Sequence, residues 1–131
     1  MECPKGFYYT KTHEWVKVDG NCATVGITSH AAEQLGDIVF VELPEVGREV
    51  KHGEAFVVVE SVKAVSDCYA PVSGRVIEVN QELVNHPELV NQDAFGAGWM
   101  VKIEMSDARE LGELMDEVQY KKVLEEEGLS K

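Results

Sequence analysis

Short valine-rich runs, separated by clusters of Gly, Pro, Asn and Asp, constrain the fold of this chain more than any other feature. β-Branched residues suit the pleated surface of a strand, whereas the separating residues favour turns. A chain of 131 residues with this pattern is expected to bury one core between β-sheets. The runs predict strands over residues 15–18, 23–28, 38–43, 55–60, 65–69, 75–80 and 99–104.

Helical signals occur in one short segment of the first half. Ser29 is expected to cap a helix over residues 30–35, and Gly36 is expected to end it. The stretch 81–98 is rich in Asn, Asp, Gly and Pro and is therefore expected to be an irregular loop.

The C-terminal tail is also expected to be helical. Asp107 and Glu110 resemble a capping box, with Asp in place of Ser or Thr. A second short helix is expected over residues 116–127, and the apolar stripe of the tail is expected to pack on the sheets. That stripe has helical spacing and consists of Leu111, Leu114, Met115 and Val118.

A weak internal repeat relates two parts of the chain. Residues 36–41 resemble residues 74–79, and residues 55–60 resemble residues 99–104. Two such units predict two facing sheets related by a pseudo-dyad. The turn that contains Lys63 joins the units, so this lysine is expected at an exposed end of the sandwich.

The charge of the chain is strongly acidic. Lys and Arg number 12 against 24 Asp and Glu, which gives a formal net charge of −12. Such a surface repels nucleic acid and anionic membranes, and we expect neither as a partner. It attracts basic proteins, and it also keeps a protein soluble. Both explanations of the charge remain open.

The cysteines and histidines suggest neither a disulfide framework nor a metal site. Cys3, Cys22 and Cys68 are odd in number and form no CxxC pair, and the four histidines show no ligand spacing. Isolated cysteines suit a reducing compartment. With no signal, transit or membrane-spanning segment ahead of the first strand, we expect a bacterial cytoplasmic protein rather than a processed mitochondrial form.

Lys63 alone would be read as an ordinary surface charge. Its surroundings change this interpretation, because the whole block from Glu60 to Gly74 resembles the lipoyl attachment hairpin of the glycine cleavage system H protein family. Val62 stands where lipoyl domains of 2-oxo acid dehydrogenases have Asp and biotin carriers have Met. Further motifs follow the family's order: Thr12–Val16, Val25–Thr28, Leu35–Val39, Val41–Pro44, Glu88–Asn91 and Gly98–Trp99.

The resemblance implies a fold as well as a family. We expect a mainly β protein, a two-sheet barrel-sandwich hybrid of the lipoyl/biotinyl-carrier kind, with one short helix in the first half and C-terminal helices. Residues 1–131 would form a single lipoyl-carrier domain, with a core of about 7–105 and a helical tail of about 107–128. A monomer is expected, because no long exposed apolar stripe is evident.

The resemblance also implies a carrier rather than an enzyme. Lipoate would be bound covalently to Lys63 and would carry the aminomethyl group of glycine. The implied partners are glycine decarboxylase (P protein), aminomethyltransferase (T protein), dihydrolipoyl dehydrogenase (L protein) and a lipoate ligase or lipoyl transferase. Glu60 is expected to help the attaching enzyme recognise the hairpin, whose other residues beside the lysine are Ser61, Val62 and Ala64.

The cargo suggests a second site. An aminomethyl adduct carries a cationic amine that is prone to hydrolysis, so a carrier gains from a water-excluding cleft with a carboxylate. By resemblance, Glu14 and Asp67 are the candidate carboxylates, with Thr12 and His13 nearby. A serine also occurs at the position of Thr12 in the family, so Thr12 departs from that form of the motif.

Three other readings remain open. The chain could donate lipoyl groups to other lipoyl proteins. It could be an unmodified acidic module that docks basic partners, which Lys63→Arg would leave intact. It could also be a thiol enzyme built on Cys68 and a histidine, whose activity would not need lipoate.

Overall fold

The computed structural model describes residues 6–129, so Cys3 lies outside the described residues. Its strands are β1 (Tyr8–Tyr9), β2 (Glu14–Asp19), β3 (Cys22–Ile27), β4 (Ile38–Glu42), β5 (Glu49–Val50), β6 (Ala55–Ser61), β7 (Val65–Tyr69), β8 (Gly74–Val79) and β9 (Val101–Met105). Its helices are α1 (Ser29–Leu35), α2 (Glu82–Asn85), α3 (Leu89–Gln92), the 3₁₀-helix η1 (Ala108–Glu113) and α4 (Glu117–Leu129).

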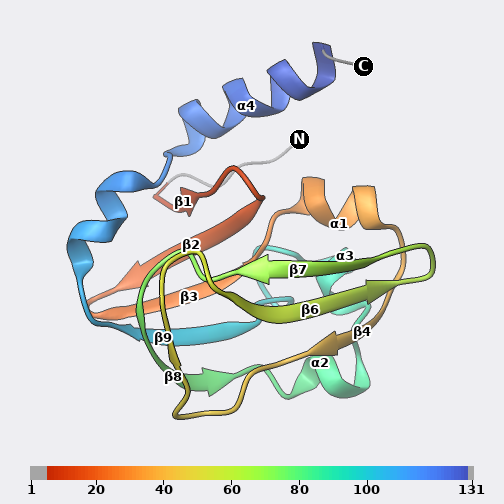
Figure 1. Ribbon diagram of the computed structural model, residues 1–131. Coiled ribbons are helices and arrows are strands. Elements are labelled where there is room, and N and C mark those ends of the chain that lie inside the picture. Colours follow the sequence, from red (N-terminus) through yellow and green to blue (C-terminus); the bar gives the residue numbers. More distant parts are fainter. Residues whose placement is uncertain (1–5, 130–131) are drawn as a thin grey trace.

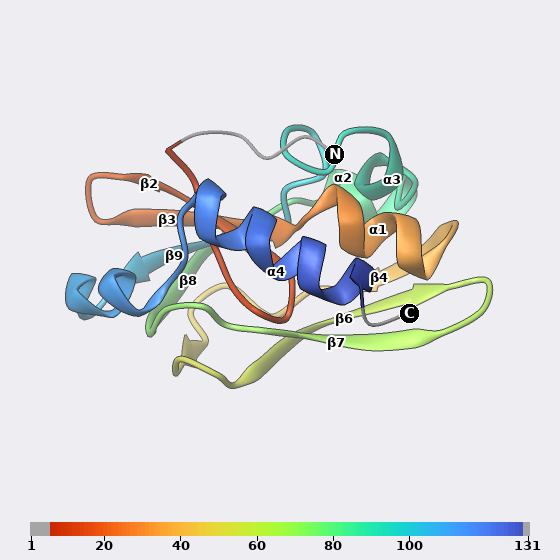
Figure 2. The same cartoon turned by 90° about the horizontal axis from the view of Figure 1, so that it is seen from above.

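The strands form two sheets, as the sequence predicts, and they do not close into a barrel. The larger sheet has the order β1-β2-β3-β9-β8-β5, and the smaller has the order β4-β6-β7. Figure 1 shows β6 and β7 as a long hairpin that extends beyond the larger sheet, toward the end where α1 and β4 meet. Seen from above, α1, α2 and α3 gather over that end of the molecule, and α4 crosses beside α1 (Figure 2).

Apolar residues from both sheets form the core. Val57 and Val59 of β6 are at most 1% exposed, and so are Val101 and Ile103 of β9. Burying each such side chain contributes roughly 1.5–3 kcal/mol relative to leaving it in water. A second cluster lies under α4 and consists of Tyr9, Trp15 and Tyr120, with Phe7 and Phe95 packed against it.

The internal repeat is visible in the strand pairing. β4 pairs antiparallel with β6, and β8 pairs antiparallel with β9. The register shifts between Ile38 and Phe40 in the first pair and between Val76 and Glu78 in the second. These shifts fall at the same place in the two repeated segments, as a duplicated strand pair predicts.

The first helix begins one residue earlier than expected. Thr28, not Ser29, is the N-cap, because its hydroxyl oxygen accepts a hydrogen bond from the Ala31 N–H at 3.3 Å. Both residues suit this position by type, and only the path of the preceding strand decides between them. Gly36 ends the helix with φ 84°, as predicted.

The expectation of an irregular loop over residues 81–98 is wrong in part. The segment contains α2 and α3, each a single turn. Leu83 and Val90 are fully buried, so one apolar residue in each turn anchors it to the core. Isolated turns of this length are not stable by themselves, and this packing accounts for their presence.

The tail is helical, but the expected capping box does not form. Asp107 caps η1 by accepting from the Arg109 N–H at 3.0 Å. Glu110 accepts instead from the Ser73 N–H at 2.6 Å and from the Ser73 hydroxyl at 2.8 Å. Of the predicted stripe, Leu111 and Leu114 pack against the main core and Met115 against the aromatic cluster, while Val118 is 56% exposed.

Two short edge strands have no sequence signal strong enough to predict them. β1 pairs Tyr8 and Tyr9 with β2, and β5 pairs Glu49 and Val50 with β8. Each has two residues, too few to show alternation. No helix among the described residues combines the length and apolar character needed to cross a bilayer.

Candidate functional site

Lys63 lies in the tight turn between β6 and β7, where the sequence predicts it. Ser61 closes this turn: its N–H donates to the Ala64 carbonyl at 2.8 Å, and its hydroxyl oxygen accepts from the N–H groups of Lys63 and Ala64 at 3.2 and 3.0 Å. A serine that satisfies neighbouring backbone groups stabilises such a turn. Lys63 is exposed, and Val62 beside it is 69% exposed.

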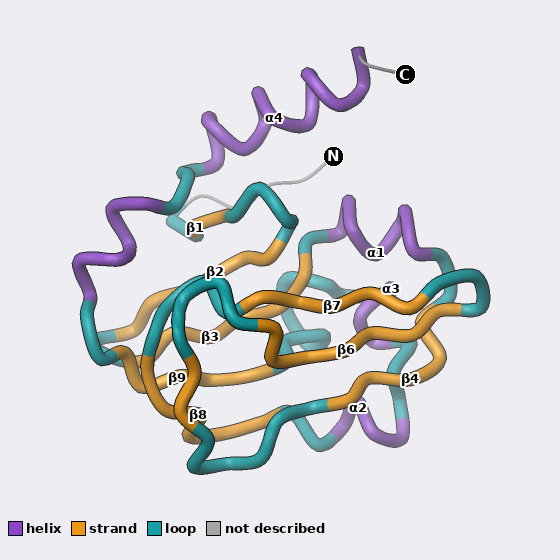
Figure 3. Tube along the Cα trace, in the orientation of Figure 1, coloured by secondary structure: helices purple, strands orange, loops and turns teal. Residues whose placement is uncertain are grey.

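The loop from α1 to β4 supports the turn. The Val62 N–H donates to the Asp37 carbonyl at 3.0 Å, and Figure 3 shows the two loops side by side. The Lys63 side chain lies over Gly36, where an added Cβ would come within 3.2 Å of Lys63 Cε. Gly36 therefore contributes both its left-handed backbone and the space that the lysine occupies.

Asn91 of α3 holds this supporting loop and is a positioning residue that the sequence did not single out. Its side-chain amide donates to the Gly36 carbonyl at 2.8 Å, and its oxygen accepts from the Ile38 N–H at 2.9 Å. Asn91 lies in Glu88–Asn91, one of the motifs that resemble the family, and this resemblance is the sequence signal that could have identified it. Its role depends on α3, which the sequence does not predict.

Glu60 lies on β6 opposite Val65 and Phe40, in the strand that leads to the turn. Its side chain is partly buried, unlike Lys63. Phe40 is 47% exposed and Val65 is 68% exposed. The region around the lysine therefore presents apolar surface with a carboxylate beside it, which suits contact with another protein.

Glu14 begins β2 and is only 2% exposed. Its Oε1 accepts from the hydroxyl of Thr10 at 2.6 Å and from the hydroxyl of Thr12, and its Oε2 accepts from the Tyr69 N–H at 3.3 Å. Burial raises the pKa of Glu14 above its ordinary value, and the hydrogen bonds from Thr10, Thr12 and Tyr69 offset part of that rise. The residues Thr10 and Tyr69 were not predicted, because their contribution comes from packing and from a backbone N–H.

The four residues predicted from the cargo line one cleft. This cleft has a volume of about 290 Å³ and lies between α1, β7 and the turn before β2. Asp67 is exposed, whereas Glu14 is buried at its side. The lining residues are Thr12, His13, Glu14, Ile27, Ala31, Gln34, Leu35, Ser66, Asp67 and Cys68.

The cleft and the lysine share supporting segments. Leu35 lines the cleft, and the next residue, Gly36, lies under the Lys63 side chain. Ser66 and Asp67 line the cleft from β7, which starts at Val65 just after the turn. The four steps of backbone from Lys63 to Asp67 span at most about 13 Å, even if fully extended. A flexible arm on the lysine can therefore reach the cleft along β7.

Cys68 does not have the properties of a nucleophile. It is 4% exposed, and burial raises the pKa of its thiol, with the charges of Glu14 and Asp67 adding to the effect. A catalytic cysteine needs a lowered pKa and access to substrate. The reading of the chain as a thiol enzyme is therefore wrong for this cysteine.

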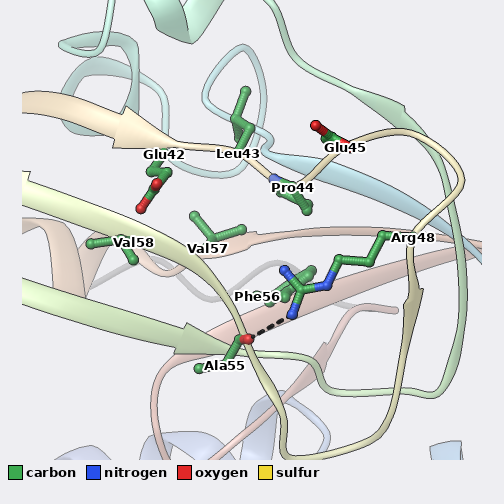
Figure 4. A pocket seen from close by; sticks show the side chains of 9 residues that line it. All are labelled: Glu42, Leu43, Pro44, Glu45, Arg48, Ala55, Phe56, Val57 and Val58. Carbon is green, nitrogen blue, oxygen red and sulfur yellow. Dashed lines mark hydrogen bonds between the residues drawn. The ribbon is translucent and has the colours of Figure 1, made fainter.

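The chain has another hollow, of about 520 Å³, at the opposite end of the smaller sheet. Figure 4 shows its lining residues, among them Arg48, whose guanidinium donates to the Ala55 carbonyl at 3.3 Å. The same group pairs with Glu54 at 2.8 Å. Ala55 begins β6, whereas Lys63 follows its end, so this hollow lies away from the lysine and contains none of the predicted site residues.

Comparisons with known proteins identify the family of this chain. The family model described as glycine cleavage H-protein matches residues 7–127. A glycine cleavage system H protein of Carboxydothermus hydrogenoformans is 58% identical over 95% of this chain and 96% of that protein. One of Thermotoga maritima is 57% identical over 91% of this chain and 96% of that protein.

A solved structure extends the agreement to three dimensions. The crystal structure of a glycine cleavage system H protein from Mycobacterium marinum matches with a TM-score of 0.83 and 43% identity, over 90% of this chain and 95% of that one. The match of the family model covers the lysine turn, the Glu14 cleft and most of α4 alike. By sequence and by fold, this chain belongs to the glycine cleavage H-protein family.

Proposed function

We propose that this chain is the lipoyl carrier of a glycine cleavage system and that its lipoate is attached through an amide bond to Nζ of Lys63. The observation that carries the proposal is the placement of an exposed lysine at a hairpin tip whose return strand borders a cleft with a buried carboxylate.

The residues around Lys63 fit a covalently bound arm. The tip is open to an attaching enzyme, Ser61 holds the turn in one conformation, and Gly36 leaves room beneath the lysine side chain. Glu60, Val62 and Ala64 flank the lysine and are the residues that a lipoate ligase or lipoyl transferase would read. Glu60→Lys should therefore slow lipoylation, and an unchanged rate would contradict this role.

When bound, lipoate supplies a disulfide that can take up the aminomethyl group of glycine and a dithiol that can be reoxidised. The chain's own residues would hold the cargo between enzymes. Glu14 and Asp67 would attract the cationic amine, and the hydroxyls of Thr10 and Thr12 would keep the Glu14 carboxylate oriented. The apolar side chains of Ile27 and Leu35 would exclude water from the cleft.

In this role the chain contributes no catalytic group. Decarboxylation, transfer of the one-carbon unit and reoxidation would be performed by glycine decarboxylase, aminomethyltransferase and dihydrolipoyl dehydrogenase, with Lys63 presented to each in turn. A lysine at a hairpin tip suits this sharing, because several enzymes can reach it without moving the sheets. Tethering also keeps the cargo at high local concentration.

We further infer that residues 1–131 act as one monomeric carrier domain in a bacterial cytoplasm. Residues of both sheets, with Ile27 and Cys68 of the cleft among them, belong to one core cluster, which supports a single cooperative unit. Light scattering during gel filtration should give the mass of one chain, 14.5 kDa before modification. A dimer mass would contradict the expectation of a monomer and leave the carrier role intact.

The experiment that tests the proposed function is the exchange of labelled bicarbonate into glycine by glycine decarboxylase. The lipoylated chain should support exchange, and Lys63→Arg should abolish it. Lys51→Arg is a matched control, because Lys51 is also an exposed lysine in a turn. Exchange that survives Lys63→Arg, or that fails with the lipoylated wild type, would overturn the proposal.

A further inference from the structure

A group of metal-ligating side chains borders the cargo cleft and shares one residue, His13, with it. His13, His30 and Glu127 each offer one ligand atom, and these atoms all lie within 4.8 Å of one another. They come from the turn before β2, from the first turn of α1 and from α4. All three side chains are partly buried. The sequence predicts no metal site, because the residues that converge here are far apart along the chain.

We propose that His13, His30 and Glu127 form a site for a divalent transition-metal ion, with zinc as the best fit, that fastens α4 to the wall of the Glu14 cleft. Two imidazoles and one carboxylate are a common ligand set for zinc in proteins, with a water molecule in the fourth position. Magnesium and calcium prefer oxygen ligands, so they do not suit this set.

One separation matches what zinc requires, and the other ligand atoms lie within 4.8 Å. Nitrogen and oxygen ligands lie about 2.0–2.2 Å from zinc, so two ligands of a tetrahedral site are roughly 3.3 Å apart. His13 Nε2 and Glu127 Oε1 are 3.1 Å apart. The ring of His30 lies 4.9 Å from that of His13, measured between centroids. The proposed site therefore requires the His30 side chain to move closer to His13 and Glu127 when the ion binds.

A second set of contacts orients the His13 ring through Nδ1, the nitrogen that would not bind the metal, as is usual for histidine ligands. His13 Nδ1 is 2.8 Å from the hydroxyl of Tyr120, which in turn is 2.7 Å from Thr28 Oγ1. Tyr120 is 0% exposed and Thr28 is 0% exposed, so the chain of hydrogen bonds is fixed by the core. A proton donated from Nδ1 to Tyr120 leaves the lone pair of Nε2 free to face a metal ion.

The backbone conformation of His13 and the net charge of the chain also support a metal site here. His13 has φ 69° and is the only residue other than glycine with positive φ in the described part of the chain. Left-handed backbone of this kind persists where the surroundings hold it and is concentrated at functional sites. The formal net charge of −12 further favours a bound cation.

The consequence would be a link between α4 and the cleft. His13 lines the cleft, and Glu127 is near the end of α4. A metal ion that joins them would hold the helix against α1 and keep the cleft wall in place. This inference concerns residues that are independent of Lys63, so it stands or falls separately from the proposed function.

The test is titration of the untagged, chelator-treated full chain with Zn²⁺ by calorimetry, and with Co²⁺ by visible absorption. The wild type should bind one equivalent of each ion, with the strong visible bands of tetrahedral cobalt. His30→Gln and Glu127→Gln should each weaken binding at least tenfold, and circular dichroism would verify that both variants fold. Tyr120→Phe should also weaken binding while the stoichiometry stays at one.

Two other His–Glu pairs supply matched controls. His52 lies 3.9 Å from Glu113 and His86 lies 3.2 Å from Glu88, both on exposed surface. His52→Gln and His86→Gln should leave zinc affinity unchanged. The proposal is overturned if the wild type binds no zinc, or if binding is insensitive to His30→Gln and Glu127→Gln; the contact between His13 and Glu127 is then an ion pair and no more.

Discussion

The Glu14 carboxylate accepts a hydrogen bond from the backbone N–H of Tyr69 at 3.3 Å. Glu14 belongs to the larger sheet and Tyr69 to the smaller one, at the end of the strand that returns from the lysine turn. The buried carboxylate is therefore attached to both sheets, next to the cleft. A group placed in this way should affect both the stability of the chain and the fate of its cargo.

Glu14→Gln should make the free chain more stable near neutral pH. A glutamine can donate to the oxygens of Thr10 and Thr12 and accept from the Tyr69 N–H, so it retains three contacts without a buried charge. We expect the free energy of unfolding to rise by on the order of 1 kcal/mol. The measurement is urea unfolding at pH 7 with a chelator present.

The pH dependence of that difference has a definite sign. Because the pKa of Glu14 is raised in the folded chain, the folded state binds more protons than the unfolded state between the ordinary carboxyl pKa and the raised one. The wild type should therefore lose stability relative to Glu14→Gln as the pH rises through that window. A difference that shrinks between pH 4 and pH 7 would contradict the buried-charge account.

Glu14→Ala should shorten the life of the aminomethyl-loaded chain and leave lipoylation intact. Loss of the carboxylate removes an attraction for the cationic amine within a site of low polarity. We expect release of formaldehyde and ammonia to accelerate roughly tenfold, which corresponds to about 1.4 kcal/mol. Asp67→Ala should act in the same direction. Glu33→Ala, an exposed change on α1, serves as the control, and unchanged decay in Glu14→Ala would refute the cargo role.

A comparison of Gly36→Ala with Gly47→Ala distinguishes the effect of backbone strain from the effect of filling the space beneath Lys63. Both glycines have positive φ, 84° and 99°, so each alanine should cost about 1–2 kcal/mol of stability. Only at Gly36 does the added Cβ meet another residue, 3.2 Å from Lys63 Cε. Gly36→Ala alone should therefore hinder the arm from lying toward the cleft and shorten the loaded lifetime. Equal lifetimes in the two variants would exclude this role of Gly36.

Cys68 should resist alkylation in the folded chain. Its side chain is buried and the pKa of its thiol is raised, so both access and thiolate are lacking at pH 8. Peptide mapping after iodoacetamide treatment should find Cys68 unmodified in buffer and fully modified in denaturant. Rapid labelling of Cys68 in the native chain would show that the cleft opens far more than its packing indicates.

The sequence predicts the features of this molecule that depend on residues close together along the chain. Valine-rich runs with turn residues between them are sufficient for the longer strands and for the exposed turn at Lys63, but not for the two-residue strands β1 and β5. They are not sufficient for α2 and α3, which depend on Leu83 and Val90 reaching the core. The choice of Thr28 over Ser29 as the helix cap likewise depends on the path of β3 into α1.

The same distinction between local sequence and tertiary packing applies to the candidate sites. Glu14 and Asp67 come from resemblance to a family, and their meeting in one cleft needs the two sheets to be packed together. The group of His13, His30 and Glu127 had no signal at all, since His13 and Glu127 are 114 positions apart. Spacing rules detect ligands within one turn or loop, whereas this group forms only when α4 folds back over α1.

The intact mass of the chain after co-expression with a lipoate ligase tests the central claim most directly. The wild type and Lys51→Arg should each gain one lipoyl group, and fragmentation should assign it to Lys63. Lys63→Arg should gain none. A lipoyl group on another lysine, or an unmodified wild type under conditions that lipoylate a known carrier domain, would contradict the account.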